Sequence, residues 1–142
     1  MHTVGQLLRV KGRQVFAIAP QESVLRAIEI MATEHVGALL VMERGALLGV
    51  FSERDYARKV ILKHRSSHDT PVADIMSSPV ITVTLDDTVQ RCMAIMTDGR
   101  IRHLPVLQNG EVVGVVSIGD LVKALLQEQS EHIEQLERYI AG

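Results

Sequence analysis

Two stretches of this sequence repeat each other: residues 49–55 read GVFSERD, and residues 114–120 read GVVSIGD. Both follow one pattern, which is a glycine, two apolar residues, a serine, two variable residues and an aspartate. The similarity extends outward at a constant offset of 65 positions, so that residues 15–62 match residues 80–127. A repeat of this length indicates one supersecondary unit used twice, with each copy covering apolar surface that the other cannot bury alone.

Each copy predicts the element order β-α-β-β-α, which is typical of an α/β fold. A short apolar strand comes first, at residues 15–18 and 80–83. Ser23 and Thr88 follow as N-caps, and apolar residues recur after them at helical spacing. We therefore expect two such units packed about a pseudo-twofold axis, with two similar clefts between them.

A hairpin and a second helix complete each copy. Asn109-Gly110 and Arg44-Gly45 stand where tight turns are needed, and the first of these pairs is the stronger hairpin signal. The second helix is expected to begin near the aspartate of the repeated motif. The flanking strands are predicted at residues 38–42 and 47–52 in the first copy, and at residues 103–107 and 112–117 in the second.

The segments around the copies are less regular. Thr70 as N-cap and Pro71 at the first helical position predict a one-turn helix over residues 70–76, whose counterpart is Thr3–Leu8. The predicted boundaries are residues 1–64 for the first repeat with its N-terminal segment, 65–69 for a linker, 70–126 for the second repeat and 127–142 for a C-terminal helix extension.

The overall composition narrows the class of protein. Of 142 residues, 46% are hydrophobic and 3% aromatic, so the core is aliphatic. A net charge of -2 argues against a broad nucleic-acid-binding or anionic-membrane surface. The single cysteine excludes an internal disulfide and a cysteine-based zinc site, and His64 and His68 lack a third metal ligand nearby. No signal peptide or transmembrane run is visible, which predicts a cytoplasmic protein.

The repeated residues resemble a known family. Besides the two motifs, residues 36–41 (VGALLV) and 101–106 (IRHLPV) are similar to one strand of cystathionine-β-synthase-type (CBS) domains. The chain is identified as a member of the tandem CBS-domain family, whose paired repeats form a Bateman module. This resemblance implies that the clefts bind an adenosine-containing ligand, such as AMP, ADP, ATP, NAD(H) or S-adenosylmethionine. It also implies that the state of the ligand is reported to a partner protein.

The serine and the aspartate of each motif have two interpretations. Spacing alone favours a capping box, with Ser52 or Ser117 as N-cap and Asp55 or Asp120 three residues later. The resemblance implies instead that each carboxylate accepts hydrogen bonds from the ribose hydroxyls of the ligand, while the serine reaches the ribose or the phosphate. The two roles can coexist.

The variable residues of the motif differ between the copies, so the two clefts are not expected to be equivalent. Arg54 and Arg58 lie four residues apart, on one face of the expected helix. They are candidates either for contacts with a polyphosphate or for a solvated surface. In the second copy Gly119 allows a backbone N–H to approach a phosphate at the helix start.

Arg102 and His103 form a second basic cluster. The resemblance implies that both contact phosphates of the ligand, whereas the first copy has the uncharged Gly37 and Ala38 at these places. The alternative is a hydrogen-bonded, partly buried His103 and a surface charge at Arg102.

An adenine ring requires an apolar slot with exposed backbone groups. The entry strands of the two copies fit this need, and Val36 and Ile101 could close the slot. Plain core packing is the alternative for these residues. The further candidates for lining the slot are Ile18, Ala38, Thr82 and Thr84.

The end of the chain predicts a long helix with an apolar seam. Its members recur at alternating spacings of four and three, and they are Val122, Leu126, Gln129, Ile133, Leu136 and Ile140. This seam either packs on the chain's own body or forms a contact with a second copy or a partner. Apolar residues in the second helix of each copy favour a homodimer, namely Val60, Ile61, Leu62, Leu121, Val122, Leu125 and Leu126.

The resemblance, taken with these patterns, implies a stand-alone regulatory protein that binds an adenine nucleotide, senses energy state and signals to an unknown protein partner without catalysis. No metal and no required cofactor are expected, since the sequence has no P-loop, no Gly-x-Gly-x-x-Gly and no nucleophile–base arrangement. The alternative is a ligand-independent dimerisation or interaction module that acts through the C-terminal helix. Contacts with nucleic acid or with a membrane are not expected.

Overall fold

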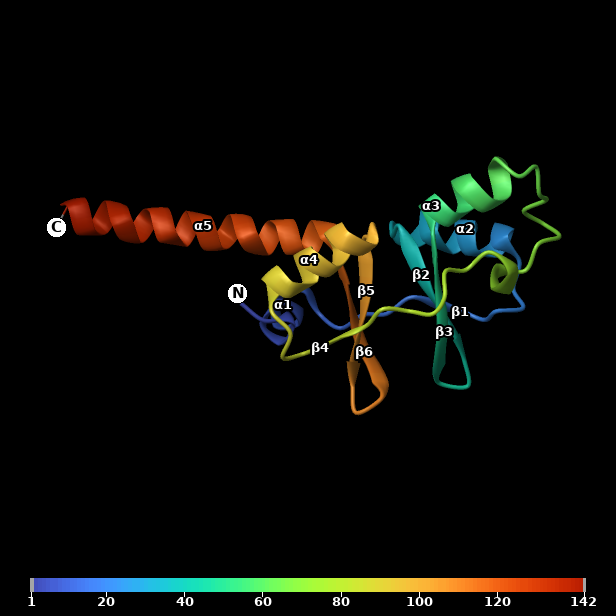
Figure 1. The fold of residues 1–142 in the computed structure, drawn as a ribbon, viewed down its shortest axis with the longest axis horizontal. Helices are drawn as coiled ribbons and strands as arrows, with labels where there is room; N and C mark the ends of the chain where they lie inside the picture. Colours follow the sequence, from blue (N-terminus) through green and yellow to red (C-terminus); the bar gives the residue numbers. More distant parts are fainter. Residues whose placement is uncertain (1, 142) are drawn as a thin grey trace. The chain divides into compact units, whose positions relative to one another are not determined.

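The computed structural model describes residues 2–141, and these residues form two compact units. One consists of residues 15–81, and we call it the first-repeat unit. The other combines residues 2–14 with residues 82–141, and we call it the second-repeat unit. Figure 1 labels the helices α1 to α5 and the strands β1 to β6.

The first-repeat unit contains a mixed sheet of three strands. β1 (Ala17–Ile18) runs parallel to β2 (Ala38–Glu43), which pairs antiparallel with β3 (Ala46–Ser52). The helical segments of this unit are α2 (Val24–Glu34), α3 (Glu53–Asp55), the π-helical η1 (Tyr56–Ile61) and the 3-10-helical η2 (Val72–Asp74).

The second-repeat unit has the same sheet topology. β4 (Val83–Thr84) runs parallel to β5 (His103–Gln108), and β5 pairs antiparallel with β6 (Glu111–Ser117). Its helices are α1 (Val4–Lys11), α4 (Val89–Gly99) and α5 (Ile118–Ala141). The α/β fold with two like repeats and a long last helix, predicted from the sequence, is confirmed.

Local signals explain where the elements start and turn. Ser23 Oγ accepts a hydrogen bond from Arg26 N (3.1 Å), and Thr88 Oγ1 accepts one from Arg91 N (3.0 Å), so both predicted N-caps are confirmed. Both hairpins turn on two residues with positive φ, which are Arg44-Gly45 and Asn109-Gly110. The two turns have the same backbone geometry, although only the second carries a strong sequence signal.

A short helical segment docks beside the first long helix of each unit. In the second-repeat unit Val4 N, at the start of α1, donates to Asp87 O (2.9 Å). In the first-repeat unit Val72 N, at the start of η2, donates to Glu22 O (2.8 Å). The two segments are therefore structural counterparts, as predicted. The N-terminal segment, however, folds with the second repeat and not with the first, beside which it lies in the sequence.

This docking explains the glycine that opens each repeated motif. A Cβ built on Gly114 would lie 2.8 Å from Leu8 Cδ1 of α1, and a Cβ on Gly49 would lie 2.6 Å from Met76 Sδ, just after η2. Both distances are too short for a carbon substituent. The glycines therefore give the docked segment room to approach β6 and β3.

Some local expectations are wrong. The entry strands are shorter than predicted, since β1 begins at residue 17 and β4 at residue 83. Thr70 is not an N-cap: Pro71 is still extended (φ -73, ψ 148), and Thr70 O accepts a hydrogen bond from Val24 N (2.9 Å). The second helix of the first copy is a π-helix after Asp55, because its backbone bonds span five residues, as between Leu62 N and Ala57 O (3.0 Å).

Each unit has its own aliphatic core. Val60 belongs to the core of the first-repeat unit and Leu121 to that of the second, and both are fully buried. They are therefore unavailable for the dimer surface that the sequence suggested, whereas Ile61, Leu62 and Leu126 are exposed. Cys92 lies on the buried face of α4, in the core of the second-repeat unit, as predicted.

Candidate functional site

The two repeated motifs occupy the same place in their sheets. Ser52 at the end of β3 pairs with Ala38 of β2, and Ser117 at the end of β6 pairs with His103 of β5. A backbone hydrogen bond closes the junction in both copies: Glu53 N donates to Gly37 O (3.1 Å), and Ile118 N donates to Arg102 O (2.9 Å). The fold thus brings Arg102 and His103 to the second motif and places uncharged residues beside the first.

In the first-repeat unit the carboxylate of Asp55 is fully engaged. Oδ2 accepts hydrogen bonds from Ser52 N (3.0 Å) and Ser52 Oγ (3.1 Å). Oδ1 lies 2.9 Å from Ser77 Oγ and 3.0 Å from Lys59 Nζ. An ionised carboxylate has about four acceptor positions. The capping box is therefore present, and the side chain, which is only 10% exposed, has its full set of partners.

In the second-repeat unit the carboxylate of Asp120 is only half engaged. Oδ2 accepts from Ser117 N (2.8 Å) and forms an ion pair with Lys11 Nζ (2.5 Å), which also donates to Val115 O (2.6 Å). No hydrogen bond within residues 2–141 reaches Oδ1. Asp120 therefore retains acceptor capacity that Asp55 lacks.

Lys11 is the site residue that sequence reasoning missed. It lies in the last turn of α1, which is 109 positions from Asp120 in the chain. In the sequence, Lys11 is visible only as a cation at the end of a short amphipathic helix. This pattern does not indicate that Lys11 pairs with Asp120. The docking of α1 onto the second-repeat unit creates the pair.

The charges in this cluster shift two pKa values. Burial by itself raises the pKa of Asp120, but the Lys11 ammonium and the Ser117 backbone N–H outweigh it, so the pKa lies below its ordinary value of 3.8. The pKa of His103 lies below its ordinary value of 6.5. Burial is the main cause, followed by the positive charge of Lys11, and Asp120 opposes the shift. His103 is therefore held neutral next to a cation–carboxylate pair.

The phosphate candidates of the first copy lie in different surroundings from those expected. Arg54 is half-buried in α3, whereas Arg58 is exposed on η1. The argument that both share one helical face assumed an α-helix, and the π-helical backbone removes its basis. Lys59 is the cation that reaches Asp55.

The candidates for an adenine slot are mostly engaged in packing or turns. Ile18 is buried in the core of its unit, and Val36 and Ile101 pack against the two cores. Thr84 is exposed at the end of β4, where its N–H donates to Asp87 Oδ2 (2.7 Å). Thr82 lies just before β4, level with the middle of β5. A Cβ on Gly119 would lie 3.7 Å from Ser117 Oγ, which is an ordinary contact. Their roles toward a ligand stay predictions.

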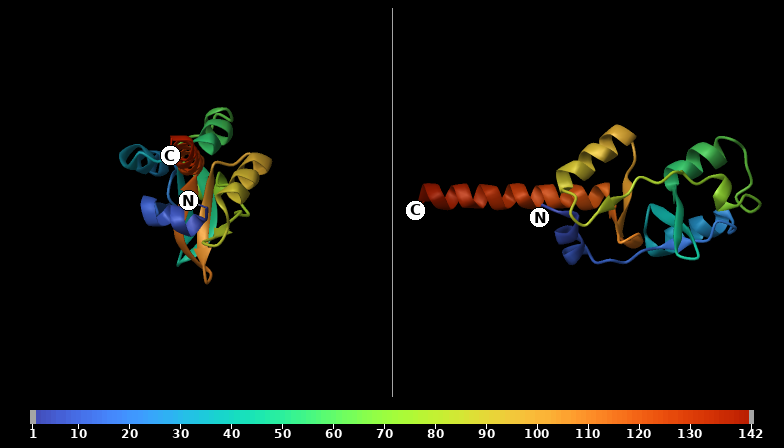
Figure 2. Two further views of the ribbon diagram at one scale, coloured as in Figure 1. Left: turned by 90° about the vertical axis from the view of Figure 1, so that its left-hand side faces the viewer. Right: turned by 60° about the horizontal axis from the view of Figure 1, so that its bottom comes forward.

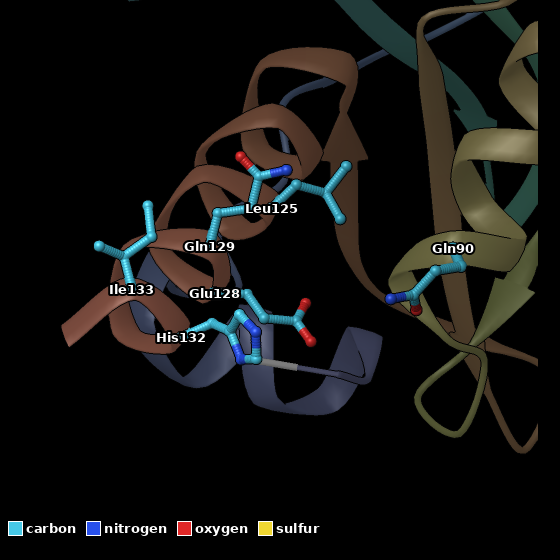
Figure 3. Close-up of a pocket in the computed structure, with 6 residues that line it drawn as sticks. All are labelled: Gln90, Leu125, Glu128, Gln129, His132 and Ile133. Carbon is cyan, nitrogen blue, oxygen red and sulfur yellow. The ribbon is translucent and has the colours of Figure 1, made fainter. Parts of the chain in front are cut away.

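A hollow of about 580 Å³ lies elsewhere, between the first turn of α4 and the middle of α5. Figure 3 shows Gln90 on α4 facing residues of α5 across it. Its lining residues are Gln90, Leu125, Glu128, Gln129, His132 and Ile133. None of them belongs to the repeated motifs, so this hollow is distinct from the Asp120 cluster.

Comparison with known proteins agrees with the repeat structure. The family model described as CBS domain matches residues 7–62 and 72–127. The CBS domain-containing protein CBSX3, mitochondrial, of Arabidopsis thaliana is 40% identical over 99% of this chain and 72% of its own length. A candidate signal-transduction protein with CBS domains from Burkholderia ambifaria has a TM-score of 0.86 at 44% identity, covering 89% of this chain and 96% of the relative.

A more distant structure shares the fold. The CBS domain pair of protein MJ0100, solved with 5-methylthioadenosine and S-adenosyl-L-methionine, has a TM-score of 0.79 at 22% identity, covering 89% of this chain and 97% of its own. The names of these relatives mention no catalytic domain. Among residues 2–141, no helix combines the length and the apolar character needed to cross a bilayer.

Proposed function

The chain belongs to the CBS-domain family, and on this premise we propose that it is a regulatory module that binds an adenosine-containing ligand at the Asp120 cluster. The observation that carries this proposal is the open Oδ1 of Asp120, beside Lys11 and His103. A partly buried carboxylate with a free acceptor atom can receive hydroxyl donors, and the nearby cations suit a negatively charged group.

A nucleotide supplies both kinds of group. The ribose diol presents two O–H donors, and one of them can bond to Oδ1 while Oδ2 stays on Ser117 N. Arg102 and Lys11 carry the positive charge that a phosphate requires. A distant relative bound to methylthioadenosine and S-adenosylmethionine supports the adenosyl class of ligand.

The two motifs are proposed to bind with different affinity. A ligand at Asp55 must displace Ser77 Oγ or Lys59 Nζ from Oδ1, whereas a ligand at Asp120 displaces nothing from Oδ1. A hydrogen bond to a charged group contributes about 1.5–3 kcal/mol. Loss of one such bond during binding therefore corresponds to a difference of roughly 10- to 100-fold in affinity.

The test is calorimetry on nucleotide-stripped protein with AMP, ADP, ATP, NAD, NADH and S-adenosylmethionine. We expect at least one ligand to bind below about 1 mM, or roughly -4 kcal/mol. Asp120→Asn should weaken that ligand roughly 10- to 100-fold, and Asp55→Asn should have a smaller effect. The 2′-deoxy form of the ligand should bind more weakly than the parent to the unaltered chain and equally to Asp120→Asn. If no member of the panel binds, the proposal is wrong.

A second candidate function is an interaction module that works without ligand. The exposed apolar residues along α5 favour it. The two functions are distinguished by adding the best ligand to the protein and comparing its mass by light scattering, since only a ligand-controlled module changes its assembly or shape on binding.

The proposed output is a signal to a protein partner, as the name of the Burkholderia relative suggests for that protein. No reaction of the bound ligand is proposed. The cytoplasmic location stays a prediction, and the Arabidopsis relative is named as mitochondrial.

A further inference from the structure

The helix α5 carries along its length an apolar stripe that nothing in the described chain covers. Figures 1 and 2 show this helix continuing beyond the sheet of the second-repeat unit. Leu126 is 60% exposed, Ile133 is 54% exposed and Ile140 is 83% exposed. Val122 and Leu136 complete the apolar part of the stripe and are exposed as well, and the exposed Gln129 is its one polar member. Exposure of a row of this kind costs free energy that a partner surface would recover.

The stripe is complementary to itself when the helix is reversed. Its residues are equidistant from Glu131 in pairs: Val122 with Ile140, Leu126 with Leu136 and Gln129 with Ile133. Two copies of α5 related by a twofold axis near Glu131 therefore bring every member of the stripe opposite another member. Self-complementarity about such an axis is the requirement for a closed dimer.

The flanking charges favour this antiparallel direction. Lys123 and Glu137 lie on the same side of the stripe, and the reversed pairing sets Lys123 of one copy beside Glu137 of the second copy, twice in the dimer. Neither side chain forms an ion pair within residues 2–141. In a parallel pairing, Lys123 would face Ile118, which packs against its own core. Only the antiparallel direction gives Lys123 an acidic partner.

The hollow beside α5 supplies a second, independent observation. It lies on the flank of the stripe that carries Leu125 and His132, opposite the flank of Lys123. Tyr139 is on the same flank as Leu125 and is 87% exposed. In the antiparallel pairing, Tyr139 of the second copy lies opposite Leu125. A tyrosine ring with an apolar body and a polar end suits a hollow that has both apolar and polar lining, namely Leu125 and Ile133 beside Gln90, Glu128, Gln129 and His132.

We propose that two copies of this chain associate through an antiparallel pair of α5 helices, with Tyr139 of each copy seated in the hollow between α4 and α5 of the other. The interface is a two-helix coiled coil centred near Glu131. It uses no residue of the Asp120 cluster and does not depend on ligand binding. Its failure would therefore leave the proposed ligand site untouched.

Sedimentation equilibrium of the full chain tests the proposal by charge reversal. The unaltered chain should show twice its 15.7 kDa mass at micromolar concentration. Lys123→Glu and Glu137→Lys should each weaken dimerisation about tenfold, because two attractive pairs become repulsive. The double variant K123E/E137K should restore the dimer. Glu131→Lys, on the outward face of the same helix, is the matched control and should leave the dimer unchanged. Far-ultraviolet circular dichroism confirms that each variant keeps its helices.

Three results would overturn the proposal. The first is a monomer for the unaltered chain at about 0.1 mM, where weak specific dimers form. The second is a dimer that K123E alone leaves intact, which would place the interface elsewhere. The third is a double variant as weak as the single ones, which would exclude the antiparallel direction. Tyr139→Ala tests whether Tyr139 is seated in the hollow of the second copy. This variant should weaken the dimer more than Glu131→Lys does.

Discussion

Replacement of Lys11 by methionine tests the one ion pair that the docking of α1 creates. Lys11 Nζ bonds to Asp120 Oδ2 (2.5 Å) and to Val115 O (2.6 Å), and the lysine side chain is 35% exposed. Bonds to charged groups contribute about 1.5–3 kcal/mol each when well shielded, and partial exposure reduces this. We therefore expect Lys11→Met to destabilise the second-repeat unit by about 1–2 kcal/mol near neutral pH.

The pH dependence of this loss follows from the pKa of Asp120. The pKa of Asp120 is lower in the folded chain than its ordinary value of 3.8. The ion pair therefore stabilises the folded chain fully above pH 3.8, and this stabilisation is lost as the pH falls through the lowered pKa. The difference between Lys11→Met and the unaltered chain should therefore be largest at neutral pH and should shrink at an acidic pH below 3.8.

Urea unfolding followed by circular dichroism at both pH values measures the effect. Arg9→Met is the matched control, because Arg9 is an exposed cation of the same helix and forms no ion pair within residues 2–141. Equal destabilisation by the two variants, or a loss for Lys11→Met that persists unchanged at low pH, would refute the reasoning.

Two further predictions concern the same unit and its counterpart. The lowered pKa of His103 means that protonation of its ring opposes folding, so the free energy of unfolding should fall as the pH drops below 6.5. In thermal melts between neutral and mildly acidic pH, His103→Gln should reduce this dependence of stability on pH. Gly114→Ala should cost about 1–3 kcal/mol through its clash with Leu8, and Leu8→Ala in the same chain should make the alanine less costly. Gly49→Ala should behave likewise against Met76. A fully neutral Gly114→Ala in thermal melts would contradict this packing argument.

The sequence was sufficient for the elements that depend on neighbouring residues. Ser23 and Thr88 cap helices through bonds that span three residues, and Asn109-Gly110 turns a hairpin by its own backbone preference. The turn sets the register of the first pairs, Gln108 with Glu111 and Leu107 with Val112, and a β-bulge between Leu107 and Val106 then shifts it by one residue, so that Ser117 pairs with His103. These are short-range effects, and the duplication of the sequence repeats them in both copies.

The sequence was not sufficient where a segment could choose between partners. Residues 2–14 precede the first repeat, yet α1 docks on the second, where the gap left by Gly114 admits Leu8. The π-helical turn after Asp55 was also unforeseen, because its composition is compatible with an ordinary α-helix.

The sequence by itself determined the duplicated α/β fold, the aliphatic core and the two Ser–Asp motifs. Apolar residues at strand and helix periods of two and 3.6 residues indicate the elements and their core, and the repeat at 65 residues indicates the duplication with its two motifs. The tertiary structure alone decided which acid keeps an open oxygen. Ser77 and Lys59 complete the shell of Asp55, whereas Lys11 arrives at Asp120 from a distant helix and occupies only Oδ2. The number of free acceptor positions depends on which side chains converge in space, and two motifs with the same serine and aspartate therefore differ in chemistry.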